Sequence, residues 1–286
     1  MANIRLIHHR IRGVQNIAKI TRAMEMIATL KMRRAQERGL AGRPYDTKIR
    51  QVIADLAALP QSGDAVLHPL LQRRPVKKIA VVHITPDRGL CGGLNGNINR
   101  KTAGFILEQR VPVTLVTVGR KGVEFMRRYR REIRAEFVRL GDQPTMFDTL
   151  PISRIIIDDY TSGEVDLVYI AYAQFISTLM QRPVLEQILP VEPAKIPQAE
   201  NVDYIYEPNP AAVLGELLPR FVEMRIYHAV MEAIASEQSA RMVAMRNATD
   251  SARELITELT LIYNKARQES ITKELLDIVG GAEALS

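Results

Sequence analysis

Apolar residues recur every three or four positions near the beginning of the chain. No glycine or proline lies between Val14 and Arg38. The apolar positions in and before this segment are Ile4, Ile7, Ile11, Val14, Ile17, Ile20, Met24, Ile27 and Leu30. Such spacing is typical of one face of an α-helix. It returns at Ile49 and Ile53, after a glycine- and proline-containing segment at 39–44. The sequence therefore predicts a long N-terminal helix that ends near Pro60, or two separate helices.

The C-terminal segment has a more regular pattern. Residues 220–279 contain neither glycine nor proline. A heptad seam is formed by Met245, Ala248, Ala252, Leu255, Leu259, Ile262 and Ala266. Heptad spacing indicates a coiled coil. A helix of this length extends roughly 90 Å, which a small globular core cannot enclose, so it needs a partner helix. We expect an antiparallel intramolecular coiled coil between the two ends of the chain.

Short apolar runs alternate with helical patterns in the middle of the chain. The predicted strands are 79–85, 111–119, 133–140, 165–175 and 182–191, and the predicted helices are 95–109, 121–130 and 147–159. This alternation favours a mainly parallel sheet covered by helices. The predicted fold class is thus α/β, with a Rossmann-like domain at 76–195 between coiled-coil helices at 1–60 and 209–286.

A glycine-rich turn follows the first predicted strand. Gly89, Gly92, Gly93 and Gly96 have the spacing G-x-x-G-G-x-x-G. A dinucleotide fingerprint needs G-x-G-x-x-G, and a P-loop needs a Lys-Ser/Thr pair directly after its last glycine. Neither is present, so a tight strand-to-helix connection is favoured over a phosphate-binding loop.

Groups that could carry catalysis are scattered along the sequence. The five histidines lie in three different segments, and His83 falls inside an apolar strand, where a hydrogen-bonded core histidine is the favoured interpretation. Asp158 and Asp159 are interpreted as solvated, and the single cysteine, Cys91, as a small buried residue. No nucleophile elbow or zinc spacing is found. We therefore predict no catalytic residue, cofactor or metal site in this chain.

Positive charge is concentrated at the N-terminal end. The chain of 286 residues has a formal net charge of +7, but residues 1–50 contain twelve basic residues against three acidic ones. Residues 207–286 contain eight basic and twelve acidic residues. A basic helix could follow a nucleic-acid backbone, yet no aromatic residue lies among the first forty to stack on bases. A mechanical or scaffolding subunit that meets acidic protein surfaces is favoured over a nucleic-acid-binding protein. No segment is apolar enough for a membrane span or a secretory signal, so we expect an intracellular protein.

Four separated segments resemble the gamma subunits of F-type ATP synthases. They are "QNIAKITRAMEMIATLKMRRAQ" (15–36), "DRGLCGGLNGN" (87–97), "SEQSARMVAMRNATDSA" (236–252) and "LIYNKARQESITKELLDIVGGAEAL" (261–285). The resemblance implies a central shaft of paired terminal helices and a foot formed by the α/β domain. It also implies that nucleotide chemistry belongs to other subunits, so that this chain transmits rotation driven by protons or sodium ions.

The same resemblance implies partners for particular residues. One copy of the chain would sit inside three alpha and three beta subunits, with its foot on the epsilon subunit and the c ring. Contacts with the beta subunits would come from Lys19, Arg22, Met24, Lys31, Arg33, Arg241, Arg267, Gln268, Thr272 and Glu274. Contacts with the c ring or epsilon would come from Tyr204, Tyr206 and Glu207. The implied location is peripheral, on the cytoplasmic face of a bacterial plasma membrane.

Overall fold

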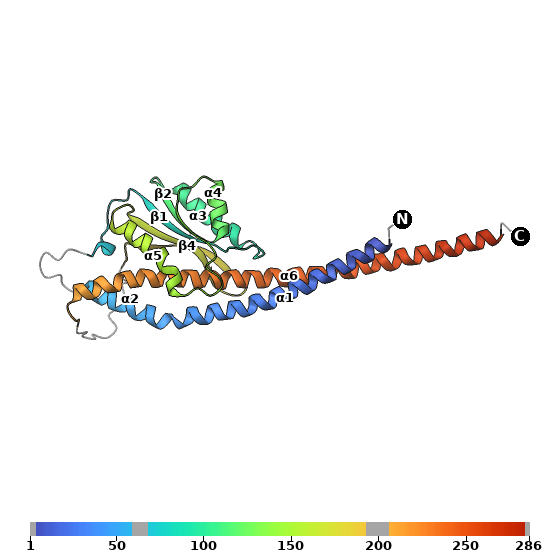
Figure 1. The fold of residues 1–286 in the computed structure, drawn as a ribbon, viewed down its shortest axis with the longest axis horizontal. Helices are drawn as coiled ribbons and strands as arrows, with labels where there is room; N and C mark the ends of the chain where they lie inside the picture. The colour runs from blue at the N-terminus through green and yellow to red at the C-terminus, as the bar shows by residue number, and fades with distance from the viewer. Residues whose placement is uncertain (1–3, 59–67, 193–205, 284–286) are drawn as a thin grey trace. The chain divides into compact units, whose positions relative to one another are not determined.

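The computed structural model describes residues 4–58, 68–192 and 206–283. The chain divides into two compact units, which we call the coil unit (Met1–Ala28 with Arg241–Ser286) and the sheet unit (Thr29–Ala240). Helices α1 (Ile4–Ala41) and α6 (Pro210–Glu283) contribute to both units (Figure 1). The N-terminal helical pattern is interrupted, because α1 ends at Ala41 and α2 (Arg43–Ala58) begins two residues later.

The sheet unit contains a five-stranded sheet in the order β3-β2-β1-β4-β5. The strands are β1 (Ile79–Ile84), β2 (Val113–Val118), β3 (Ile133–Phe137), β4 (Leu167–Phe175) and β5 (Gln181–Leu189). The connecting helices are η1 (Pro69–Leu71), α3 (Leu94–Glu108), α4 (Arg120–Arg128) and α5 (Met146–Thr161). Four strands pair in parallel and β5 pairs antiparallel to β4. The predicted Rossmann-like α/β fold is confirmed.

The position of each strand in the sheet follows from its residue pattern. All six residues of β1 are buried, as expected for a central parallel strand with helices on both faces. In β3 the residues alternate between half-buried and exposed, with Arg134 and Glu136 at the exposed positions. Alternation of this kind suits an edge strand, which has one covered face.

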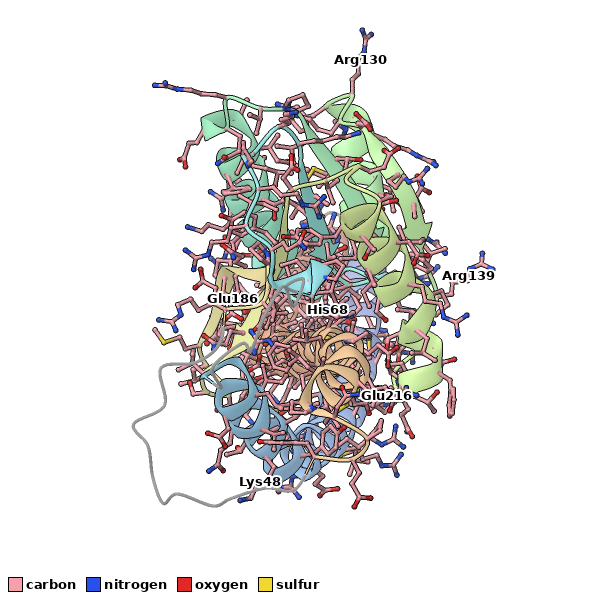
Figure 2. The ribbon with its side chains drawn as sticks, turned by 90° about the vertical axis from the view of Figure 1, so that its left-hand side faces the viewer. Lys48, His68, Arg130, Arg139, Glu186 and Glu216 are labelled. Atoms are coloured by element: carbon pink, nitrogen blue, oxygen red, sulfur yellow. The ribbon has the colours of Figure 1, made fainter. Side chains whose placement is uncertain are left out.

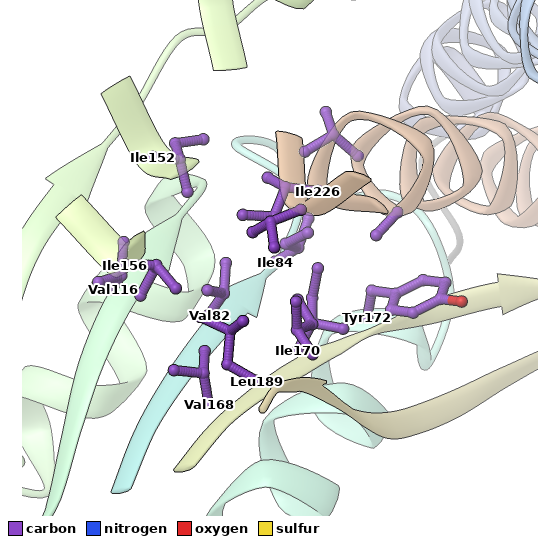
Figure 3. Close-up of a cluster of buried hydrophobic side chains, with 14 of the residues drawn as sticks. Val82, Ile84, Val116, Ile152, Ile156, Val168, Ile170, Tyr172, Leu189 and Ile226 are labelled. Carbon is purple, nitrogen blue, oxygen red and sulfur yellow. The ribbon is translucent and has the colours of Figure 1, made fainter. Parts of the chain in front are cut away.

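Two apolar cores lie on opposite faces of the sheet. On one face, Ile98 and Ile106 of α3 and Met126 of α4 pack with Val81 and Leu115. On the other face a larger core joins the alternate strand residues to α5 and α6, as Figure 3 shows for Val82, Ile156, Ile170 and Ile226. Residues of α1 and α2 also belong to this second core.

The connection from β2 to α4 depends on a glycine. Gly119 has φ +90°, and a Cβ built there would lie 1.8 Å from the carbonyl oxygen of Thr85. The same turn is held by Asp87, whose carboxylate accepts hydrogen bonds from the backbone N–H of Arg120 and of Arg139, both at 2.9 Å. Asp87 thus fixes the loops that follow β1, β2 and β3 at the carboxyl edge of the sheet.

The domain limits expected from the sequence, 1–60, 76–195 and 209–286, remain predictions. The segment 193–205, which contains the end of the second range, lies outside the described residues.

Candidate interaction surfaces

The coil unit is an antiparallel pair of helices. Thr21 of α1 lies against Thr249 of α6, with 2.7 Å between their hydroxyl oxygens, whereas the rings of His8 and Tyr263 are 5.8 Å apart. Along the coil, the residue number decreases in α1 while it increases in α6. The two helices therefore run antiparallel, which confirms the prediction. Ile7, Ile11, Met245 and Ala252 are buried in the seam.

A buried polar layer interrupts this apolar seam. The carboxylate of Glu25, 4% exposed, accepts hydrogen bonds from Arg22 at 2.7 Å and from Arg246 at 3.0 Å. Burial acts to raise the pKa of Glu25, but the hydrogen bonds from Arg246 and Arg22 outweigh it and hold the pKa below its usual value. Glu25 therefore stays ionised and joins the two helices at one register.

The predicted partner-binding residues on the N-terminal part of α1 differ in their surroundings. Lys19 is exposed, and Met24 is half-buried. The side chain of Arg22 is 55% exposed and is already bonded to Glu25. Lys19 therefore keeps a charge directed to solvent, whereas Arg22 has an additional structural role within the coil.

Lys31 and Arg33 lie in the sheet unit. The Lys31 ammonium is 2.6 Å from the carboxylate of Asp142, which also accepts a hydrogen bond from Gln238 at 3.3 Å. Arg33 is exposed. Asp142 escaped the sequence interpretation because it lies 111 residues from Lys31, in a loop without helical or strand periodicity. The Lys31 charge is thus partly satisfied inside the chain.

The predicted C-terminal contact residues occupy the end of α6, except for Arg241. Arg241 is buried, with 9% of its surface exposed. Arg267, Gln268, Thr272 and Glu274 are exposed. These four lie within two helical turns and present polar groups to solvent on the coil unit.

The predicted foot contacts are only partly visible. Tyr204 lies outside the described residues. Tyr206 is half-buried and Glu207 is exposed, just before α6 begins.

The glycine-rich turn connects β1 to α3, and Gly93 caps that helix. Gly92 has φ +58°, and Cys91 is buried against Leu94 and Ala173, as predicted for a small core residue. In nucleotide-binding α/β sheets the ligand lies where the strand order reverses, here at the carboxyl ends of β1 and β4. Helix α6 covers the end of β4, because the Ser236 hydroxyl donates to the carbonyl of Ala173 at 2.8 Å.

Two buried polar side chains of the sheet unit test interpretations made from the sequence. His83 is fully buried, with Nε2 2.9 Å from Asn99 Oδ1 and Nδ1 3.0 Å from the Thr102 hydroxyl, so the interpretation as a core histidine is confirmed. The interpretation of Asp159 as solvated is wrong. Asp159 is 8% exposed and pairs with Arg134 at 3.3 Å, since α5 packs behind the edge strand β3.

Two kinds of feature are absent from the described residues. These residues contain no cluster of three or more metal-binding side chains. None of their helices combines the length and the apolar character that a membrane span needs.

The family model described as ATP synthase matches residues 3–285. A relative named ATP synthase gamma chain from Dehalococcoides mccartyi (strain CBDB1) is 71% identical over the whole of both chains. This chain belongs to the ATP synthase gamma-chain family. A gamma chain from Chloroflexus aurantiacus (strain ATCC 29366 / DSM 635 / J-10-fl) is 50% identical over the full length of both. The family resemblance predicted from the four sequence segments is therefore confirmed.

Solved structures share the fold at low identity. The rotor of the Euglena gracilis mitochondrial ATP synthase, in rotational state 1, has 18% identity and a TM-score of 0.61 over 94% of this chain and 98% of that chain. A second Euglena structure, titled OSCP/F1/c-ring, has 20% identity and a TM-score of 0.65 over 99% and 94%. The fold is thus shared along nearly the whole length of this chain.

Proposed function

We propose that this chain is the central rotor shaft of an F-type ATP synthase, coupling ion-driven rotation of a membrane ring to ATP synthesis or hydrolysis on other subunits. The observation that carries the proposal is the ATP synthase family match over residues 3–285, together with relatives named gamma chain that align from end to end. The antiparallel coil is suited to this task, because a two-helix coil resists bending and twisting better than a single helix does.

The exposed C-terminal part of α6 supports the proposal that other subunits surround the shaft. Every residue from 271 to 280 is exposed. Five of them are large and apolar: Ile271, Leu275, Leu276, Ile278 and Val279. Contiguous exposed apolar residues mark a surface that is buried in an assembly. A sleeve of alpha and beta subunits around this end of the shaft would bury them.

Exposed basic side chains on α1 and α6 support the proposed contacts with acidic loops of the beta subunits. Lys19 and Arg33 are exposed, and Arg267, Gln268, Thr272 and Glu274 present polar groups near the other end of the coil. In the proposed complex these residues, with Arg22, Met24, Lys31 and Arg241, meet the beta subunits. The segment with Tyr206 and Glu207, together with Tyr204, meets the c ring or epsilon.

The proposed complex contains one copy of this chain with three alpha subunits, three beta subunits, one epsilon subunit and the c ring. It sits on the cytoplasmic face of a bacterial plasma membrane, where this chain is peripheral. Nucleotide is bound and hydrolysed on the partner subunits.

Affinity purification of the tagged full-length chain from native membranes tests the proposal. The expected result is a stable, ATP-hydrolysing complex that contains three copies each of two larger chains, together with a membrane ring. Recovery of the chain with polynucleotide that salt removes, and without those subunits, would contradict the rotor function and favour a nucleic-acid-binding protein.

A further inference from the structure

A group of four arginines surrounds the end of α4. The segment 127–131 has the sequence RRYRR. Arg127 and Arg128 lie in the last turn of α4, whereas Arg130 and Arg131 follow its end. Cations in the last turn of a helix interact favourably with its dipole, which accounts for Arg127 and Arg128. The two arginines beyond the helix end need another explanation.

The nearby carboxylates are already paired with other cations. Glu124 lies 2.7 Å from Lys121, and Glu132 lies 3.2 Å from Lys78. Glu136 accepts two hydrogen bonds from Arg127, at 2.7 and 2.9 Å. Among the described residues, Arg128, Arg130 and Arg131 form no ion pair. Arg128 attracts the carboxylate of Glu124 without an ion pair, so most of the positive charge of these three arginines remains for an external partner.

Arg130 occupies a backbone position that favours glycine. It has φ +51°, directly after the helix end, and the backbone N–H of Arg131 closes the turn by donating to the carbonyl of Met126 at 3.1 Å. Glycine is the usual residue at this place, because a Cβ is disfavoured in the left-handed region. Figure 2 shows Arg130 extending away from the ribbon into solvent. The backbone conformation at this position thus favours glycine, yet the sequence places a charged side chain there.

An aromatic residue lies between the arginines. Tyr129 is 58% exposed, and its ring packs against that of Phe125 in a tilted arrangement, with 4.8 Å between the centroids. Exposed tyrosine beside basic residues is typical of surfaces that meet the headgroup layer of a membrane. Clusters of four to eight arginines or lysines that lie next to a membrane attract anionic lipid headgroups.

We propose that this arginine cluster, Arg127, Arg128, Arg130 and Arg131 with Tyr129, binds the anionic phospholipid headgroups of the adjacent membrane. The choice of a membrane rests on the proposed rotor function. A rotating subunit that bound a stationary acidic protein would have to break that contact in every turn, whereas lipids exchange laterally and allow rotation. An acidic subunit that rotates with the shaft is the alternative partner, and binding to polyglutamate but not to anionic vesicles would reveal it. The cluster would thus hold the sheet unit near the membrane surface without stopping the shaft.

Flotation of the purified full-length chain with vesicles tests this inference independently of ATP synthase assembly. We expect binding to phosphatidylcholine vesicles that contain phosphatidylglycerol, little binding to phosphatidylcholine alone, and loss of binding at high salt. The triple variant Arg128→Gln/Arg130→Gln/Arg131→Gln should bind between about tenfold and a hundredfold more weakly. The matched control Lys101→Gln/Arg120→Gln/Arg154→Gln removes the same charge from exposed positions elsewhere on the sheet unit and should retain most of the binding.

Arg130→Gly separates lipid binding from folding. Because glycine is favoured at this backbone position, the variant should melt at the wild-type temperature or above it, yet bind anionic vesicles about fivefold more weakly. Equal binding to neutral vesicles, equal losses in the two triple variants, or binding to polyglutamate but not to anionic vesicles would each overturn the inference. Failure to co-purify with ATP synthase subunits would instead contradict the proposed function.

Discussion

The imidazole of His83 is a fully buried titratable group whose contacts suit the neutral ring. The Asn99 amide oxygen can accept from Nε2–H while the Thr102 hydroxyl donates to Nδ1. Burial lowers the pKa of His83 to about 4, and the hydrogen bond to Asn99 opposes this only in part. Protonation would place an uncompensated charge inside the sheet, so this residue makes folding depend on pH.

We predict that the free energy of unfolding falls as the pH is lowered from 7 to 5. In the unfolded chain the histidine pKa is about 6.5, so between that pH and about 4 the unfolded state binds more protons than the folded state. The stabilisation is complete above the unfolded pKa and is lost progressively as the pH falls towards the folded one. At pH 5 the loss from His83 should be about 2 kcal/mol. Urea titrations at the two pH values measure it.

His83→Gln provides the control, because it removes the titrating group and leaves an amide that can form hydrogen bonds. The variant should be less stable than wild type at pH 7 but should lose about 2 kcal/mol less on acidification. An unchanged pH dependence would assign the effect to other groups.

Some residue environments were accessible from the sequence and others were not. His83 and Cys91 stand among apolar or small neighbours, so local sequence indicated burial. Asp159 was misjudged because its partner Arg134 lies 25 residues away on another element. Lys31 and Asp142 meet only after the sheet unit has folded. Contacts between distant charges leave no periodic signal in the sequence.

At the scale of elements, the polar layer in the coil unit makes a testable contribution. Glu25→Ala should lower the free energy of unfolding by about 1–3 kcal/mol. The change removes two charge-assisted hydrogen bonds from a buried position. The cost stays below that of a fully buried pair because Arg22 and Arg246 are 55% and 57% exposed and can be rehydrated. Thermal and urea unfolding measure the change.

Glu258→Ala is the matched control for Glu25→Ala, since Glu258 is an exposed glutamate on the other helix of the coil unit, α6. Its effect should stay within about 0.5 kcal/mol. Equal effects of the two variants would mean that the buried carboxylate does not hold the helices together.

Elements were predicted well where one period dominates the sequence. All five predicted strands are present, because each is a short apolar run bounded by turn residues. The heptad seam was predicted less well. Ala252 is 7% exposed as expected, but Leu255 is 42% exposed. A heptad pattern fixes which face can be buried, while the extent of burial depends on where the partner helix lies.

At the scale of the whole molecule, the positive surface of α1 should act on partners rather than on folding. We predict that Arg33→Glu/Arg34→Glu leaves the free energy of unfolding within about 0.5 kcal/mol of wild type, because both side chains are exposed. In the proposed complex the variant should reduce ATP-driven ion pumping, since it would repel acidic loops. Pumping into vesicles at low salt and urea unfolding of the chain test the two statements.

Lys31→Glu serves as the contrast. It places a carboxylate beside Asp142, so it should cost about 0.5–1 kcal/mol in folding. If Arg33→Glu/Arg34→Glu pumps normally while it assembles normally, the positive surface does not contribute to coupling.

Mechanical coupling by a shaft also requires that the shaft be stiff, and substitutions of Ala252 test this requirement. Ala252 is buried in the seam of the coil unit, so Ala252→Phe would force the helices apart and cost about 1–3 kcal/mol. Ala252→Pro would remove a helix hydrogen bond and cost roughly 3 kcal/mol or more. In the proposed complex a softer coil transmits less torque, while ATP hydrolysis on the partner subunits continues. The ratio of ion pumping to ATP hydrolysis in reconstituted vesicles should therefore fall in both variants.

Leu255→Phe is the control for added bulk, because it enlarges an exposed position one helical turn away and should keep the wild-type ratio. All complexes must first show equal assembly, since loss of the shaft itself would also uncouple the enzyme. A wild-type ratio under an opposing ion gradient in assembled Ala252→Phe would show that stiffness of the seam is not limiting. The contacts that decide coupling would then have to lie in the sheet unit, which carries the paired Lys31 and the proposed foot residues Tyr206 and Glu207.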